Sequence, residues 1–321
     1  MSGRAGHVIV RTCGYDQALR NGQNRGWEDA QATGARLHRT GGPLTGEWDF
    51  RGIDPGEELP DIDTSVPHTA RIYDYILGGK DNFAADRQAA AKAMAANPHL
   101  ARAMRENRAL MRRMVAWLAR DAGVRQFLDI GTGLPTSPNV HEIAQAAAPD
   151  ARVVYVDNDP IVLTHARALL TSTPEGATAY IHADLRDPDK ILDDPRLRQT
   201  LDLSQPVALT ILGVLHFIPD DDDPWGVVAR LMAALPSGSY LAVQHPTQDF
   251  YAEAKGTDRS YRSSGIAFQY RTKDEFLRFL DGLELVPPGL QPMTEWRAED
   301  EPEPRPAPSE VGAFAAIGRK P

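Results

Sequence analysis

From about residue 123 onward, short apolar runs alternate with amphipathic stretches. A short apolar run bounded by Gly, Pro or Asp is typical of a strand buried on both faces of a parallel sheet. The strands predicted in this way are 126–130, 152–156, 178–182, 206–212 and 240–244. The helices predicted between them are 138–148, a helix that begins at residue 160, and 224–235. Strand, helix and strand at this spacing predict an α/β fold with a doubly wound parallel sheet.

Helical patterns dominate the chain ahead of the predicted sheet. The helices expected there are 70–77, 84–96 and 98–121. Because the first strand follows directly, we expect a helical N-terminal segment over residues 61–122 and a sheet domain over 123–321. Residues 1–60 show no sustained period, and we expect a disordered or weakly ordered extension.

The last part of the chain is predicted to complete the sheet. The polar stretch 247–270 has little periodicity, so we expect a loop or lid near the functional site. Thr272 and Glu275 have capping-box spacing and predict a helix to residue 281. Two closing strands are expected at 283–286 and 312–317.

Composition narrows the class of protein. The chain has 321 residues, a net charge of −9 and a sequence pI near 5.5, which argues against binding nucleic acid or anionic membranes. Cys13 is the single cysteine, so an internal disulfide is excluded. We expect a cytoplasmic protein with no membrane segment and no metal site, because the His and Cys residues lack ligand spacing. The oligomeric state is not predicted.

A glycine turn follows the first predicted strand. Asp129 ends that strand, and Gly131 and Gly133 let the backbone approach a ligand closely. A dinucleotide fingerprint needs a third Gly, but Thr136 stands there. Like charges 4 Å apart at an effective dielectric of about 20 repel by about 4 kcal/mol, so Asp129 disfavours a pyrophosphate. The turn therefore favours S-adenosylmethionine, a cation, as the ligand. A dinucleotide-dependent enzyme is the weaker alternative among enzymes. The remaining alternative is a buried structural turn that binds no ligand.

Three successive predicted strands end in an aspartate, which places three carboxylates at one edge of the sheet. Asp129 would orient the methionine ammonium, and Asp157 would accept hydrogen bonds from the ribose diol. Asp184 would accept a hydrogen bond from the adenine amine, with Leu185 against the ring. We assign Asn158 and Gly213 to the same cofactor site. Each aspartate alone could instead cap a helix, and NAD would also use Asp157.

The helical N-terminal segment supplies further candidates for the site. Tyr73, Gly78, Gly79 and Lys80 are expected to fold over the cofactor, with Lys80 offering a cation to the methionine carboxylate. A plain helix-ending turn is the equal alternative. Arg105, Asn107 and Arg108 are expected to lie mostly on a solvated helix face, with Asn107 a faint candidate for the site.

Two histidines follow the fourth and fifth predicted strands. His216 and His245 should therefore lie at the ligand edge, and their ordinary pKa near 6.5 suits a general base at neutral pH. A structural, hydrogen-bonded histidine is the favoured alternative for each. Methyl transfer depends mainly on alignment, so a base is needed only when the acceptor must lose a proton.

Several motifs occur in a characteristic order, namely ARIYDYILGGKDNFAADR, QFLDIGTGLPT, VDNDP, ADLRDP and VLHFIPD. Together they resemble the actinobacterial S-adenosylmethionine-dependent methyltransferase family DUF574, or Methyltransf_19, from about residue 62 to 320. The resemblance implies a Rossmann-like class I methyltransferase sheet of seven strands, the last one antiparallel, with an N-terminal helical cap. It implies no particular substrate. We expect a methyltransferase that acts on a small-molecule acceptor, and the alternative is a non-catalytic regulator that binds S-adenosylmethionine or S-adenosylhomocysteine.

Overall fold

The computed structural model describes residues 62–169, 171–251 and 256–321, so the predicted extension over residues 1–60 lies outside the described residues. Eight strands form one sheet in the order β3-β2-β1-β4-β5-β8-β6, and β7 also pairs with β8. The strands are β1 Gln126–Ile130, β2 Arg152–Asp157, β3 Ala177–His182, β4 Ala208–Leu212, β5 Tyr240–Pro246, β6 Glu284–Leu285, β7 Gln291–Pro292 and β8 Ala313–Arg319.

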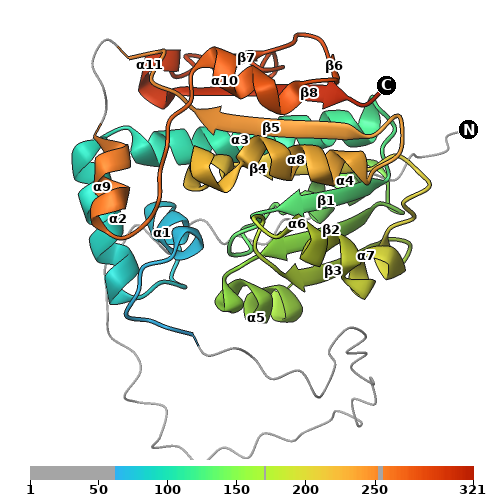
Figure 1. Cartoon of the computed structure of the whole chain (residues 1–321), viewed down its shortest axis with the longest axis horizontal. Helices are drawn as coiled ribbons and strands as arrows, with labels where there is room; N and C mark the ends of the chain where they lie inside the picture. Colours follow the sequence, from blue (N-terminus) through green and yellow to red (C-terminus); the bar gives the residue numbers. More distant parts are fainter. Residues whose placement is uncertain (1–61, 170, 252–255) are drawn as a thin grey trace, which may run out of the picture. The chain divides into compact units, whose positions relative to one another are not determined.

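Strands β1 to β5 are parallel, and β8 runs antiparallel to β5 (Figure 1). The chain passes from β3 back across β1 to begin β4, so the winding reverses between β1 and β4. The predicted doubly wound α/β sheet with its last strand antiparallel is confirmed. The sheet has eight strands where seven were expected: Pro287 and Pro288 have no backbone N–H to extend β6, and the short strand β7 is added beside β8.

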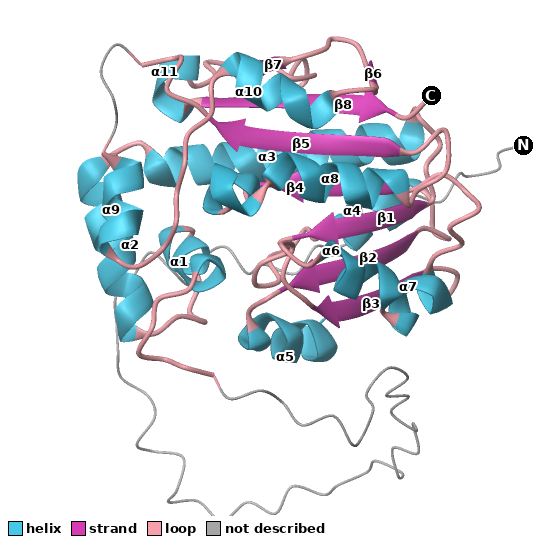
Figure 2. Ribbon diagram, viewed as in Figure 1, coloured by secondary structure: helices cyan, strands magenta, loops and turns pink. Residues whose placement is uncertain are grey.

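Helices cover both faces of the sheet (Figure 2). The helices are α1 Thr69–Ile76, α2 Ala84–Ala96, α3 Leu100–Arg120, α4 Val140–Ala147, α5 Pro160–Leu169, α6 Pro188–Asp193, α7 Pro195–Thr200, α8 Pro224–Ala233, α9 Thr257–Ser263, α10 Lys273–Leu277 and α11 Pro308–Val311. Apolar side chains of α3, α4, α5 and α11 form one core with one face of the sheet. Those of α6, α7, α8 and α10 form a second core on the other face.

The long helix α3 is held by one apolar face. Leu110, Met114 and Leu118 repeat at a spacing of four residues and are fully buried against the sheet. The helix begins at Leu100 and not at Pro98 as predicted, because residues 98–99 form a turn between α2 and α3. Strand β1 is buried at every position, as its apolar sequence predicts.

Four short helices, α6, α7, α9 and α11, were not predicted. Helices α6 and α7 have an Asp N-cap followed by Pro at the first helical position, which is a start signal visible in the sequence at Asp187 and Asp194. Helix α9 lies inside the stretch 247–270, which was expected to be a loop. Its one strongly buried aromatic, Tyr261, packs with Phe268 against α2, so tertiary contacts stabilise a segment whose sequence has little period.

The cap helices are joined to the segment that follows β5. Helix α9 packs against α2 (Figure 1), and Ile72 of α1 shares a buried cluster with Tyr261 and Phe268. Arrowheads of β1, β2 and β3 point toward α1 in the same view, so α1 lies at the carboxyl edge of the sheet. Within the part of the chain that the structure describes, no helix combines the length and apolar character needed to cross a bilayer.

We expect Leu110→Ala to lower the free energy of unfolding by about 2–5 kcal/mol, because truncation leaves a cavity between α3 and the sheet. Leu110 is 0% exposed, whereas Leu285 is 45% exposed and provides the matched control. Leu285→Ala should change stability by less than about 0.5 kcal/mol. Urea denaturation followed by circular dichroism measures both. Equal losses for the two variants would show that α3 is not held by this face.

Candidate functional site

Asp129 lies at the end of β1, and its carboxylate is almost completely buried at 8% exposure. Thr210, its register partner on β4, donates a hydrogen bond from Oγ1 to Asp129 Oδ1 at 2.5 Å. Burial raises the pKa of Asp129 to about 6, while the bond from Thr210 and the positive charge of Arg108 act in the opposite direction. At neutral pH the ionised form therefore predominates, and this edge of the sheet carries a buried negative charge.

The glycine turn follows the end of β1. Gly131 has φ +72°, and a Cβ there would lie 2.1 Å from Val214 Cγ2. Gly133 has φ +66° and donates its backbone N–H to Asp157 Oδ2 at 2.8 Å. Both glycines are therefore required by backbone conformation, and Gly131 also by close approach. Asn139 and Glu142 then form a capping box at the start of α4.

Asp157 ends β2 next to this turn and is 7% exposed. Its carboxylate accepts two hydrogen bonds, one from Gly133 N and one from Asp159 N at 3.0 Å. Burial raises the pKa of Asp157, and the two backbone donors oppose that shift. A carboxylate has about four lone-pair sites, so about two remain available for a ligand.

The cap is attached to this edge by buried ion pairs. Arg71 Nε of α1 lies 3.1 Å from Asp159 Oδ2 and 3.7 Å from Asp86 Oδ1. His68 Nδ1 lies 3.0 Å from Asp159 Oδ2. Since Asp159 N also donates to Asp157, these contacts connect the cap to the carboxylate at the end of β2. Asp159 also caps the start of α5, because its Oδ1 accepts a hydrogen bond from Ile161 N.

Asp184 lies two residues beyond the end of β3 and has a different environment. Arg186 donates three hydrogen bonds to its two carboxylate oxygens, and Asn158 Nδ2 donates a fourth at 3.0 Å. These contacts lower the pKa of Asp184 to about 2, with the side-chain bond from Arg186 as the main cause. All four lone-pair sites are occupied, which argues against the predicted hydrogen bond to an adenine amine. Leu185 is buried in the core, so its side chain does not offer an open surface to a ring.

The turn after α1 is held together from within. Asp74 Oδ2 accepts hydrogen bonds from Asp81 N and Asn82 Nδ2. Gly78 has φ +88°, and a Cβ on Gly79 would lie 1.9 Å from Asp74 Oδ1. These contacts explain both glycines as parts of a structural turn, which was the alternative interpretation. Lys80 is exposed, and its contact with the cofactor stays a prediction.

His245 is fully enclosed, at 1% exposure. Its Nδ1 lies 2.7 Å from the carbonyl oxygen of Pro246, and its Nε2 lies 2.8 Å from Arg271 Nη1. Because guanidinium nitrogens only donate, Nε2 must accept and Nδ1 must carry the proton. Burial and the charge of Arg271 lower the pKa of His245 to about 3. These contacts argue against the predicted role of His245 as a general base.

His216 is buried in an aromatic cluster with Phe217 and Phe268. Burial lowers its pKa well below 6.5, so the ring is neutral. Its Nδ1 has no hydrogen-bond partner among the described residues. His216 therefore accepts hydrogen bonds more readily than it holds a proton, and its role as a base stays a prediction.

Helix α3 supplies residues that the sequence pattern assigned to solvent. Arg105 is exposed as expected, but Asn107 and Arg108 are only partly exposed and face the sheet edge. Arg108 Nη2 donates to the carbonyl oxygens of Thr136 and Pro138, beyond the glycine turn. The expectation of a solvated face was wrong for these two residues, because no periodicity reveals that α3 crosses above the glycine turn.

Asn107 belongs to a polar group around Gly213, the residue that follows β4. Tyr73 donates its hydroxyl to the carbonyl oxygen of Met104 at 3.0 Å, and Asn107 Nδ2 lies 3.5 Å from the Tyr73 hydroxyl. A Cβ on Gly213 would lie 3.1 Å from Asn107 Nδ2 and 4.0 Å from Gln244 Oε1. Tyr73 and Gly213, both predicted site residues, are therefore brought together with Gln244, which was not predicted.

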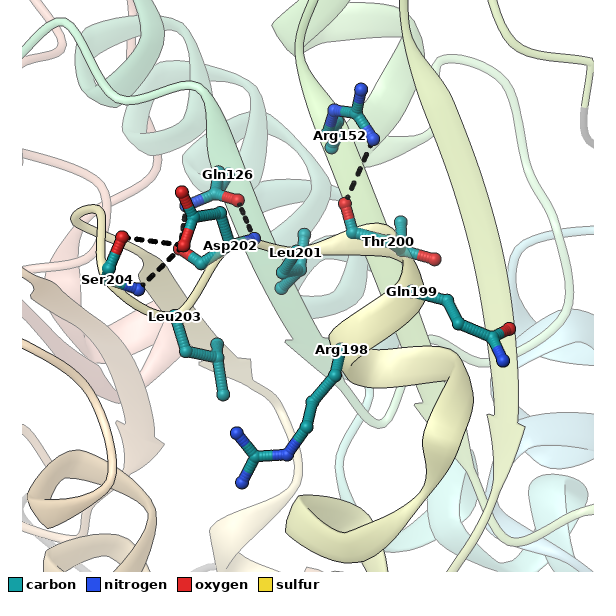
Figure 3. A pocket seen from close by; sticks show the side chains of 9 residues that line it. All are labelled: Gln126, Arg152, Arg198, Gln199, Thr200, Leu201, Asp202, Leu203 and Ser204. Atoms are coloured by element: carbon teal, nitrogen blue, oxygen red, sulfur yellow. Dashed lines mark hydrogen bonds between the residues drawn. The ribbon is translucent and has the colours of Figure 1, made fainter.

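Two hollows lie at the opposite edge of the sheet. The one in Figure 3, about 740 Å³, is lined by residues at the amino ends of β1 and β2, in α7 and directly after α7, including Gln126, Arg152 and Thr200. The other, about 460 Å³, extends from Ala122 to Arg319 along the same edge. Ligands of doubly wound sheets bind at the carboxyl edge, so neither hollow belongs to the predicted site.

Comparison with known proteins decides the family. Residues 55–321 match the S-adenosyl methyltransferase family Methyltransf_19. The chain belongs to this family. A DUF574 family protein from Streptomyces avermitilis MA-4680 has 50% sequence identity, covers 81% of this chain and 100% of its own, and superposes with a TM-score of 0.77. For a proposed methyltransferase from Thermobifida fusca YX the identity is 43%, the coverage 80% and 96%, and the TM-score 0.74. No curated protein matches the sequence.

The chain is thus an S-adenosylmethionine-dependent methyltransferase, as the motifs predicted, and S-adenosylmethionine is its cofactor. The residues present fit that cofactor. The edge carries the buried carboxylate of Asp129, and Asp157 retains free acceptor sites beside the glycine turn. A dinucleotide enzyme is excluded by the family, and a non-catalytic regulator is not favoured by it.

We expect the ion pair of His68 with Asp159 to make the stability of the methyltransferase depend on pH. Burial opposes protonation of His68, but the hydrogen bond and charge of Asp159 outweigh it and raise the pKa above 6.5. The pKa of Asp159 is held below 3.8, because His68 and Arg71 outweigh its burial. The ion pair therefore contributes its full stabilisation of the folded protein between pH 3.8 and pH 6.5. This contribution is lost as the pH rises through the raised pKa of His68.

Substitution of His68 by Gln should accordingly cost about 1 kcal/mol at pH 5.5 and progressively less toward pH 8.5. Urea denaturation at several pH values measures this difference. His99→Gln removes an imidazole outside the network and serves as the control. A cost for His68→Gln that stays constant over this range would contradict the assignment.

Proposed function

We propose that this methyltransferase binds S-adenosylmethionine across the ends of β1 and β2 and transfers its methyl group to a small-molecule acceptor. One observation carries the assignment of the site: Asp157 is buried beside the glycine turn with about two of its acceptor sites unused. A ribose diol offers two hydroxyl donors, which matches this vacancy. Asp184, by contrast, has no acceptor site left.

Asp129 and Arg108 suit the amino-acid end of the cofactor. The ionised Asp129 attracts the ammonium and sulfonium charges, which reinforce its ionisation. Arg108 already donates Nη2 to Thr136 and Pro138, which fixes the guanidinium above the turn and leaves other N–H groups for a carboxylate. The negative charge of Asp129 is thus placed for the ammonium of the amino-acid group, and the positive charge of Arg108 for its carboxylate.

Bound S-adenosylmethionine supplies a methyl group on a positively charged sulfur. The protein contributes orientation, for which effective molarities of about 10⁵–10⁸ M are attainable, and exclusion of water by α1 and α3. The neutral His216 can accept a hydrogen bond at the acceptor's side of the sheet. The net charge of −9 supports a small-molecule acceptor over a nucleic acid, because a nucleic acid would be repelled. The cytoplasmic location stays a prediction.

We expect Asp157→Asn to weaken binding of S-adenosylhomocysteine by about tenfold or more, because the charge-assisted bonds to the ribose are lost. Isothermal titration calorimetry measures the affinity, and transfer from methyl-labelled S-adenosylmethionine to acceptors in a cell extract measures activity. Asp150→Asn, an exposed carboxylate at the amino edge, is the matched control and should leave affinity unchanged. Unaltered affinity of Asp157→Asn would refute this placement of the ribose.

Arg108→Met should weaken binding of S-adenosylhomocysteine by about tenfold but leave 5′-methylthioadenosine unaffected, because only the former has the amino-acid carboxylate. The matched control is Arg112→Met, one turn further along α3 and exposed. Calorimetry with both ligands separates the two effects. A similar loss for both ligands would mean that Arg108 supports the fold of the turn and does not read the carboxylate.

A further inference from the structure

Thr210 lies at the centre of β4, in a row of core side chains. Its neighbours Leu209 and Ile211 face the other side of the sheet, where they belong to the second core. On its own side, the strand register aligns Thr210 with a row that consists of Tyr180, Tyr155, Asp129, Ala242 and Ile317. Apart from Asp129 and Thr210, the members of this row belong to the core that packs against α3. The carboxylate and the hydroxyl therefore form a polar pair among apolar and aromatic side chains.

The hydroxyl of Thr210 is committed to Asp129. Thr210 is 0% exposed, and its Oγ1 donates to Asp129 Oδ1 at 2.5 Å. Its side chain makes no other hydrogen bond within the described residues. A buried strand position normally favours Val or Ile, which have similar shape and need no polar partner. What the hydroxyl adds at this position is the contact with the carboxylate.

Asp129 keeps one carboxylate oxygen for a further donor. Oδ2 makes no hydrogen bond within the described residues, in contrast to Oδ1. It is also not one of the described acceptors that are sealed from solvent without a partner. Thr132, in the glycine turn, donates its hydroxyl to the backbone oxygen of Asp129 at 3.3 Å. The side chain of Asp129 can therefore accept a donor from a ligand through Oδ2.

Two charged side chains face Asp129. Arg108 of α3 lowers its pKa, and Asp157 of β2 raises it. Burial is the largest influence and raises the pKa of Asp129 to about 6. The hydrogen bond from Thr210 is the strongest influence that opposes burial, ahead of Thr132 and Arg108.

The other titratable groups near Asp129 are neutral. Burial raises the pKa of the Tyr155 and Tyr180 hydroxyls well above 10. His141 of α4 lies 2.8 Å from the Tyr155 hydroxyl, and burial lowers the pKa of its imidazole. Among the groups around Asp129, Thr210 is therefore the one whose removal should change the ionisation of the carboxyl most.

We propose that Thr210 is a positioning residue for the cofactor: it binds one oxygen of Asp129, so that the carboxylate stays ionised at neutral pH and presents its other oxygen to the ammonium of S-adenosylmethionine. This inference rests on the proposed function, which places the amino-acid end of the cofactor at Asp129. Loss of a hydrogen bond to a charged group shifts an ionisation equilibrium by about tenfold or more. Without the hydroxyl, much of Asp129 would be protonated at neutral pH and would no longer attract the ammonium.

Four proteins test this role through the pH dependence of cofactor binding. Thr210→Val replaces the hydroxyl by a methyl group of similar size. Thr210→Ser and Thr210→Ala both lack the original methyl group and differ from each other only in the hydroxyl. Calorimetry with S-adenosylhomocysteine between about pH 5 and pH 8 gives the affinities, and thermal unfolding shows which variants are folded.

In the wild type, the affinity for S-adenosylhomocysteine should fall about five- to tenfold from neutral pH to pH 5, as Asp129 takes up a proton. The midpoint of this fall should move up by about one pH unit or more in Thr210→Val and Thr210→Ala, and stay near the wild-type value in Thr210→Ser. 5′-Methylthioadenosine has no ammonium, so its pH profile reports the other titrating groups of the site, such as His68. That profile should be the same in all four proteins.

The comparison of Ser with Ala keeps the test valid even when Thr210→Val does not fold. Equal midpoints in Thr210→Ser and Thr210→Ala would assign any change to packing and would overturn the role of the hydroxyl. A shift of the same size with 5′-methylthioadenosine would overturn it as well, because the effect would not involve the ammonium. Failure of the wild type to bind S-adenosylhomocysteine at any pH would instead overturn the proposed function itself.

Discussion

Burial of acidic groups at the carboxyl edge of the sheet is the constraint to which the surrounding structure responds. A desolvated carboxylate is costly unless donors or cations surround it. Asp157 is stabilised by backbone N–H groups of the glycine turn and of Asp159, and Asp159 by Arg71 and His68 of the cap. The turn, the second strand and the cap are thus linked through one series of contacts. A cationic ligand fits such an edge because it supplies the charge that the protein alone does not.

The aspartates near the carboxyl ends of neighbouring strands have different properties. Asp129 has a raised pKa because its burial outweighs the hydrogen bond from Thr210, whereas Asp184 has a lowered pKa because Arg186 engages both of its oxygens. Position along the strand therefore decides where a carboxylate lies but not whether it is free to bind. The remaining acceptor capacity, counted from hydrogen bonds, separates a ligand contact from a structural one.

Local signals predicted the sheet well, and the site only in part. The apolar run of β1 and the capping boxes at Asn139 and Thr272 depend on neighbours within a few residues, so they can be recognised in sequence. The pairing of His245 with Arg271 spans 26 residues, and no local pattern reports it. Likewise Asn107 of α3 and Gln244 of β5 both approach Gly213 because of tertiary packing, which no local pattern reports.

The contact of Arg71 with Asp159 also bears on how enzymes of this kind can diversify. In many folds a peripheral segment can be replaced while the central sheet is kept, provided that the interface between them is apolar or hydrated. Here the junction contains an almost fully buried guanidinium and two carboxylates. A foreign cap without its own arginine would leave the Asp159 carboxylate buried without this compensating positive charge. The helices and the sheet must therefore be inherited as one unit.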